Sequence, residues 1–310
     1  MREPGTAARW IHAAVLLLSL ACFGWVLWPV WRHGRELAAG VHGGALWRGI
    51  LLGAVLYALL SVLLALAWWW LAGIYGPRPT VRTGYAVYAR SQLAKYLPGN
   101  AFHYVSRQLL GRRAGLSHPA LVASGLLELG SLLLAAVLAA AVGLRVARSA
   151  ADAGLWSWPW ALAAGLAALV AWPLLDALLR RWRPTSRWLA ELPHLSLGRT
   201  LRLLGPAVAL HLAFFAGVGI LLMLLASAWE RPFSELASVL WAFPIAWAAG
   251  TVAVGAPAGV GVREAVLALA LEPLVGPARA AALALALRLV TTGGDLLSAL
   301  FGWRLRERRG

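Results

Sequence analysis

Residues 49–75 read GILLGAVLYALLSVLLALAWWWLAGIY, an apolar stretch without a single charged side chain. An α-helix rises about 1.5 Å per residue, so about 20 apolar residues cross the ~30 Å hydrocarbon core of a bilayer. Similar stretches recur along the chain, near residues 10–30, 119–143, 154–179, 203–228, 236–255 and 279–303, with a shorter one near 261–275. The pattern predicts an all-α polytopic membrane protein with seven to eight transmembrane helices, forming a single integral membrane domain over residues 1–310.

The composition excludes other classes of protein. Hydrophobic residues make up 61% of the chain and charged residues only 13%, and the mean hydropathy is +0.73. Soluble domains carry about a quarter charged residues, and disordered chains are less hydrophobic still. The net charge of +16 does not indicate a nucleic-acid partner, because most cations lie in short connections between apolar stretches. The lone Cys22 forms no Cys pair for a metal, and we expect no metal site and no cofactor.

The distribution of cations predicts the orientation. With a cytoplasmic N-terminus, 19 of the 28 Lys and Arg residues lie on the cytoplasmic side and seven on the other. We therefore expect a multi-pass protein of a bacterial-type cytoplasmic (inner) membrane with both termini cytoplasmic. The apolar stretch at 10–30 is too long for a signal peptide and is expected to be retained as the first span.

Two segments differ from the regular spans. The first, at about 84–110 within a polar stretch at 76–118, is either a surface structure or a re-entrant hairpin. The second, at 236–275, is either a re-entrant hairpin or two full spans. Each contains residues that break helices, because proline lacks a backbone donor and glycine weakens a helix. These residues are Pro98 and Gly99 in the first segment, and Pro257, Gly259 and Gly261 in the second.

Interrupted segments in corresponding positions of two halves are typical of inverted-repeat transporters. The two halves here would cover about 1–143 and 154–303. Ordinary proline kinks, which transmembrane helices tolerate, are the alternative interpretation.

Several ionisable residues lie in apolar surroundings, where each costs about 2.5–3.5 kcal/mol at the centre of a span. Such residues face the interior of a helix bundle or a wet cavity, and usually pair. Arg263 and Arg288 are expected to pair with Glu128, Glu264 and Asp295, whereas Asp176 is expected at the membrane interface. The pairs either form a binding site or only hold helices together.

The segment at 84–113 contains Lys95, the only lysine beside 27 arginines. With Arg90 and Arg107 it would line a cationic, aromatic-rich cavity. An amphipathic helix lying on anionic headgroups is the alternative. The chain has no Walker, HExxH or GxSxG motif, and we expect no catalytic residue.

The sequence KYLPGN at 95–100, followed by His103, Tyr104 and Arg107, resembles the first signature of the lysylphosphatidylglycerol synthase transmembrane region, also called the flippase-like family. PAGVGVRE at 257–264 is similar to the second signature, with Ala258 where glycine is common. The resemblance extends over essentially the whole chain and includes Glu128, Arg288 and Asp295. It implies a stand-alone member without the soluble aminoacyl-transferase domain that some relatives carry.

The resemblance and the charges together predict a flippase-like lipid transporter and not an enzyme. The expected ligand is a membrane lipid that carries phosphate: an anionic phospholipid, a hopanoid or a polyprenyl-phosphate-linked lipid. Glu128, Glu264 and Asp295 would balance charge or couple transport. The residues expected to bind the lipid phosphate are Lys95, Asn100, His103, Tyr104, Arg107, Arg263 and Arg288.

Two other functions remain open from the sequence. The first is a non-transporting scaffold for a partner glycosyltransferase or lipid-modifying enzyme. The second is a membrane transferase with Glu264 or His103 as a base. The sequence leaves the oligomeric state open.

Overall fold

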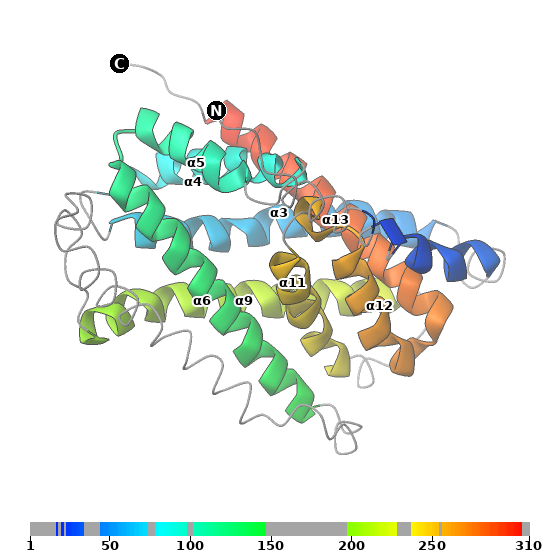
Figure 1. Ribbon diagram of the computed structural model, residues 1–310. Helices are drawn as coiled ribbons and strands as arrows, with labels where there is room; N and C mark the ends of the chain where they lie inside the picture. The colour runs from blue at the N-terminus through cyan, green and yellow to red at the C-terminus, as the bar shows by residue number, and fades with distance from the viewer. Residues whose placement is uncertain are drawn as a thin grey trace.

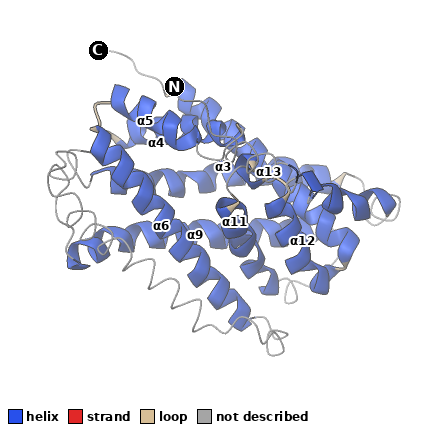
Figure 2. Ribbon diagram, viewed as in Figure 1, coloured by secondary structure: helices blue, strands red, loops and turns tan. Residues whose placement is uncertain are grey.

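The computed structural model describes residues 23–33, 44–73, 78–97, 102–146, 197–227, 237–253 and 256–305, together with positions 17, 20 and 21. These residues are helical or lie in short connections, and none of them is in a strand (Figure 2). Figure 1 shows α4 between α3 and α5, while α12 lies between α11 and α13. The described part of the chain is therefore a packed bundle of helices.

Four of the described helices are long and apolar enough to cross a membrane. They are α3 (Ala45–Ala72), α6 (His118–Val146), α9 (Leu197–Ala226) and α13 (Pro277–Arg304). They coincide with four stretches predicted from the sequence, and the chain is a polytopic all-α membrane protein. The predicted span at 154–179, and Asp176 with it, lies outside the described residues. Of the predicted span at 10–30, residues 23–30 form part of a described helix.

The first broken segment consists of two short helices joined at an interruption. α4 (Val81–Gln92) continues into the 3-10 turn η2 (Leu93–Tyr96), and α5 (Phe102–Arg113) follows the break. At 1.5 Å per residue, α4 and α5 are each about 18 Å long, too short to cross ~30 Å of hydrocarbon. We call residues 81–113 the first hairpin. Pro98, Gly99 and Asn100 lie outside the described residues.

The second broken segment has the same construction. The turn η5 (Ala237–Trp241) leads into α11 (Ala242–Val252), the turn η6 (Pro257–Gly259) forms the break, and α12 (Val262–Val275) follows. α12, the longer of the two helices, is about 21 Å long, again too short for a full span. The lengths favour the re-entrant alternative over two full spans. We call residues 237–275 the second hairpin.

The two hairpins enter the bundle from opposite sides. α3 and α9 are antiparallel, since Trp70 Nε1 donates to the Leu203 carbonyl at 3.0 Å and Gly49 lies beside Leu225. The first hairpin follows the end of α3, where the Arg78 guanidinium stacks on Trp70 at 4.1 Å. The second hairpin follows the end of α9, which η5 contacts. Because these two helix ends lie on opposite sides, the hairpin entrances do too.

Aromatic rings attach the second hairpin to α9. Phe215 packs edge-on against Trp247 of α11, with ring centroids 5.5 Å apart, and also contacts Phe243 at 6.1 Å. All three rings belong to the largest buried cluster of the described residues or pack against it. Buried aromatic pairs of this kind stabilise packing beyond the area that they remove from solvent. The cluster fixes α11 firmly, so the break at η6 has a defined position.

Candidate functional site

A polar cavity lies where the two hairpins meet. Its volume is about 150 Å³, and η2 of the first hairpin contacts η6 of the second. The following polar and aromatic side chains, from six α-helices and the turn η2, face the cavity: Tyr57, Tyr88, Gln92, Lys95, His103, Tyr104, Arg107, Glu128, Trp247, Thr251 and Arg263. This volume accommodates a small charged group, whereas pockets for whole drug-sized ligands have about 300–1,000 Å³.

Lys95 and Tyr96 connect the first hairpin to the last helix. Lys95 Nζ lies 2.7 Å from Asp295 Oδ2, and the Tyr96 hydroxyl donates to the same oxygen at 2.7 Å. Asp295 is buried, at 3% exposure, so its charge is balanced by direct contacts and not by solvent. Tyr96 also donates to Thr292, one turn before Asp295.

Arg107 and Glu128 form a buried ion pair between the first hairpin and α6. The Arg107 Nε also donates to Ser91 Oγ at 3.2 Å, and its guanidinium stacks over Tyr88 at 4.3 Å. Arg107 and Glu128 are both almost fully buried. A planar guanidinium satisfies a carboxylate, a hydroxyl and an aromatic face at once, which the point charge of lysine does not. Arg107 is therefore fixed in place.

Glu264 organises the break of the second hairpin. Its Oε2 accepts from the Gly261 backbone N–H at 2.6 Å, which caps the start of α12. Its Oε1 accepts from Arg288 at 3.2 Å, and Arg288 also donates to the Ala258 carbonyl at 3.1 Å. Ala258 has φ 49° and ψ 26°, a left-handed conformation that L-residues with a Cβ adopt at a cost. Arg288 thus holds the carboxylate and the backbone of the break.

Arg263 differs from the other three cations. It lines the cavity against Gly250, yet none of the carboxylates in the described part of the chain forms an ion pair with it. Its Nε is buried without a hydrogen-bond partner. A buried polar group without a partner is costly, and a buried charge more so. Among the seven charged residues of the site, four cations face three carboxylates, and each carboxylate pairs with a cation other than Arg263.

The pairs differ from those predicted from the sequence. Arg288 pairs with Glu264 as expected, but Arg263 pairs with none of the three acids. Glu128 pairs with Arg107 and Asp295 pairs with Lys95, because the first hairpin places its own cations beside α6 and α13. Of the predicted residues, Lys95, His103, Tyr104, Arg107, Glu128 and Arg263 line the cavity, whereas the choice of ion-pair partners depends on the packing.

The remaining predicted residues are placed as follows. His103 and Tyr104 line the cavity with ring centroids 4.0 Å apart, and His103 Nδ1 is buried without a hydrogen-bond partner. Arg90 is not one of the cavity-lining residues. Asn100 lies outside the described residues, so its predicted role stays a prediction.

Several cavity residues were not predicted, among them the polar residues Tyr57 of α3 and Thr251 of α11. Tyr57 is the only tyrosine in an otherwise apolar span before its aromatic end, a signal that could have identified it. Thr251 had no such signal, since isolated threonines are common in spans. Within the described residues, no three His, Cys, Asp or Glu side chains are grouped as a metal site.

The comparisons with known proteins agree with the motifs. The family model of the lysylphosphatidylglycerol synthase TM region matches residues 11–299. No curated protein matches the chain, and no solved structure does. The matched range includes both hairpins and all seven charged residues of the site.

Proposed function

The chain belongs to the lysylphosphatidylglycerol synthase TM-region family, and from this premise and the polar cavity we propose that it moves a phosphate-bearing lipid between the two leaflets. The protein itself is a multi-pass membrane protein linked to lipid metabolism or translocation. In the proposed reaction no covalent bond changes, so the chain acts as a transporter and not as an enzyme. We place it in the cytoplasmic membrane with both termini cytoplasmic, as the cation distribution predicts.

The proposal rests on the positive charge of Arg263, which has no carboxylate partner among the described residues. A buried guanidinium without a carboxylate is stabilised when an anion enters the cavity, and its planar fork grips phosphate through two parallel hydrogen bonds. One excess positive charge suits a phosphodiester, which carries one negative charge. The three ion pairs around Arg263 leave the rest of the cavity neutral, so the bound headgroup contributes the missing charge.

The opposite entrances of the hairpins support translocation. The turns η2 of the first hairpin and η6 of the second contact each other at the shared cavity, and the two hairpins approach it from opposite sides. Opening along one hairpin and then along the other would expose the phosphate to each leaflet in turn, as in transporters with inverted repeats. The lipid chains would stay in the hydrocarbon, since only the headgroup needs the polar path.

A leaflet-exchange assay tests the proposal. Purified protein is reconstituted into vesicles that contain a fluorescent phosphatidylglycerol, phosphatidylethanolamine or polyprenyl phosphate, and exchange is followed with an impermeant quencher. We expect the wild type to accelerate exchange of a lipid with a single net negative charge. Arg263→Gln should slow it on the order of a hundredfold, because the phosphate loses its charged partner.

The matched control is Arg113→Gln, the same change at an exposed residue at the end of α5. It should exchange lipid at the wild-type rate. If the folded wild type accelerates exchange of none of these lipids, the translocation proposal is wrong, and the scaffold for a lipid-modifying enzyme becomes the better interpretation.

A further inference from the structure

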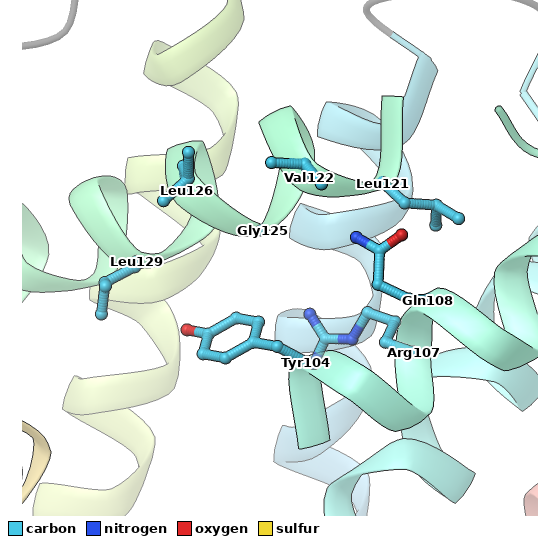
Figure 3. A pocket seen from close by; sticks show the side chains of 8 residues that line it. All are labelled: Tyr104, Arg107, Gln108, Leu121, Val122, Gly125, Leu126 and Leu129. Carbon is cyan, nitrogen blue, oxygen red and sulfur yellow. The ribbon is translucent and has the colours of Figure 1, made fainter. Parts of the chain in front are cut away.

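A second pocket lies between α5 and α6, beside the polar cavity (Figure 3). Its volume is about 200 Å³. The α5 side consists of Tyr104, Arg107 and Gln108, and the α6 side is apolar and contains Leu121, Val122, Gly125, Leu126 and Leu129. At one end the two helices touch, since a Cβ added to Gly111 would lie 2.4 Å from Leu121. The helices therefore diverge from that contact, and the pocket fills the space between them.

The two cavities share a wall. Tyr104, Arg107 and Leu129 line both the polar cavity and the α5–α6 pocket. Arg107 is immobilised by Glu128 and Ser91, as described above. The Tyr104 ring contacts the His103 ring at 4.0 Å and lies 5.7 Å from the Arg107 guanidinium, and it passes over Gly125, where an added Cβ would lie 3.3 Å from the ring. Because Arg107 is held by an ion pair, a path between the two cavities would have to open by rotation of the Tyr104 ring.

The far side of the pocket faces an apolar surface. Leu126, which lines the pocket from α6, is 46% exposed, and its neighbours on the outer face of α5, Val105 and Leu109, do not line the pocket but are exposed as well; for a membrane helix such exposure means contact with lipid chains. Gln108 is the polar exception, and its buried Oε1 has no hydrogen-bond partner. In Figure 3 its amide group points toward α6, at the opposite end of the pocket from the Tyr104 hydroxyl. The pocket thus has an apolar α6 wall and, on its α5 wall, the Gln108 amide with an oxygen that has no partner.

We infer that the α5–α6 pocket is the lateral opening through which a lipid keeps its hydrocarbon chain in the bilayer while its phosphate occupies the polar cavity, with Tyr104 as the gate between them. The inference rests on the proposed function and names the occupant as an acyl or isoprenoid chain. The shared wall is the physical reason: a headgroup beside Arg107 and Arg263 has its chain directed into the adjoining apolar pocket. The unpartnered Gln108 amide suits the ester or hydroxyl group at the junction of chain and headgroup.

The position of the pocket along α6 assigns it to one leaflet. Its α6 residues end at Leu129, about 17 Å from the start of the helix at His118, on the side where the first hairpin enters. The opening therefore serves the leaflet on that side, which the cation distribution predicts to be cytoplasmic.

Blocking the pocket tests the inference in the leaflet-exchange assay. Leu126→Trp places a large ring at the mouth without touching the polar cavity, and Leu224→Trp on α9 is the matched control, since Leu126 and Leu224 are 46% and 47% exposed. We expect Leu126→Trp to slow exchange on the order of tenfold, equivalent to about 1.4 kcal/mol of barrier. Leu224→Trp should leave the rate unchanged.

A second pair of variants fills the pocket from inside. Gly125→Leu would occupy it and press on Tyr104, whereas at Gly130, five residues along the same helix, an added Cβ has no atom within 4 Å, so Gly130→Leu is the control. Of these two variants, only Gly125→Leu should lose lipid exchange. If each blocking variant matches its control while the wild type is active and Arg263→Gln is slow, this inference is wrong and the proposed function stands. An inactive wild type would overturn both.

Discussion

Lys95 of the first hairpin and Asp295 of the last helix form an ion pair of 2.7 Å, and the Tyr96 hydroxyl donates to the same carboxylate oxygen. The first hairpin also packs on α13 through α4, where the Tyr85 and Phe301 ring centroids lie 5.8 Å apart, and this oxygen is the point at which charged and polar groups of η2 bind α13. If the first hairpin moves so that the cavity opens toward the side from which the hairpin enters, η2 must either lose these two contacts or move together with Asp295. The pair is therefore the strongest candidate for a latch between the two halves of the site.

Neutralising one partner of this pair should destabilise the protein more than neutralising both. Asp295→Asn leaves the Lys95 ammonium unbalanced beside the cavity, and the loss of one partner from a buried pair costs about 3–5 kcal/mol. The double variant Lys95→Gln/Asp295→Asn keeps no unbalanced charge and should recover most of the stability. Thermal unfolding of the purified protein in detergent measures both. Equal midpoints for the single and double variants would contradict the latch.

Arg107→Lys should destabilise the protein, although it keeps the positive charge. The lysine ammonium cannot donate to Glu128 and Ser91 and also stack on Tyr88 as the guanidinium does. We expect a loss of about 2 kcal/mol in the free energy of unfolding, since buried hydrogen bonds to charged groups are worth about 1.5–3 kcal/mol. Arg113→Lys, an exposed arginine of the same helix, is the control. If the Arg107→Lys protein unfolds at the wild-type temperature, the positive charge alone is sufficient for stability at this position.

Ala258→Gly should stabilise the break of the second hairpin. Ala258 has φ 49°, and a left-handed conformation costs a residue with a Cβ about 1–2 kcal/mol, a cost that glycine avoids. We expect a gain of about 1 kcal/mol in the free energy of unfolding.

The control for this prediction is Ala256→Gly, two residues earlier. Ala256 has φ −75° and ψ 116°, so glycine there adds only flexibility and should lose a few tenths of a kcal/mol or more. The opposite ranking of the two variants would mean that Ala258 is not strained.

Gly294→Val should separate α3 from α13. A Cβ added at Gly294 would lie 2.5 Å from the Tyr57 ring and 2.8 Å from the Ala54 carbonyl oxygen, and the latter is backbone that cannot move aside. Small residues let membrane helices approach closely, and overpacking costs about 1–3 kcal/mol. Because Tyr57 also lines the cavity, lipid exchange should fall together with the unfolding temperature.

Gly130→Val is the control for this packing prediction, since Gly130 has no atom within 4 Å of an added Cβ. It should unfold at the wild-type temperature. A Gly294→Val protein as stable as this control would show that α3 and α13 adjust to one another without cost.

The spans were predictable from composition alone. The stretches at 49–75, 119–143, 203–228 and 279–303 agree with the described helices to within a few residues, because a run of about 20 apolar residues has few alternatives to a membrane helix. The interruption near Pro257 was predictable in the same way, from proline and glycine. The short length of α11 was not, since its sequence is as apolar as that of a full span.

The sequence by itself determined that this protein is a bundle of membrane helices with two broken segments and buried charges that need partners. The tertiary structure alone decided which charges meet. Ion pairing depends on distance in space, and the pairs join different elements: Lys95 with Asp295, Arg107 with Glu128, and Arg288 with Glu264. Composition sets the cost of burying a charge but not the identity of its partner. Only the packing of the two hairpins leaves Arg263, of the three cations that line the cavity, without a carboxylate partner among the described residues.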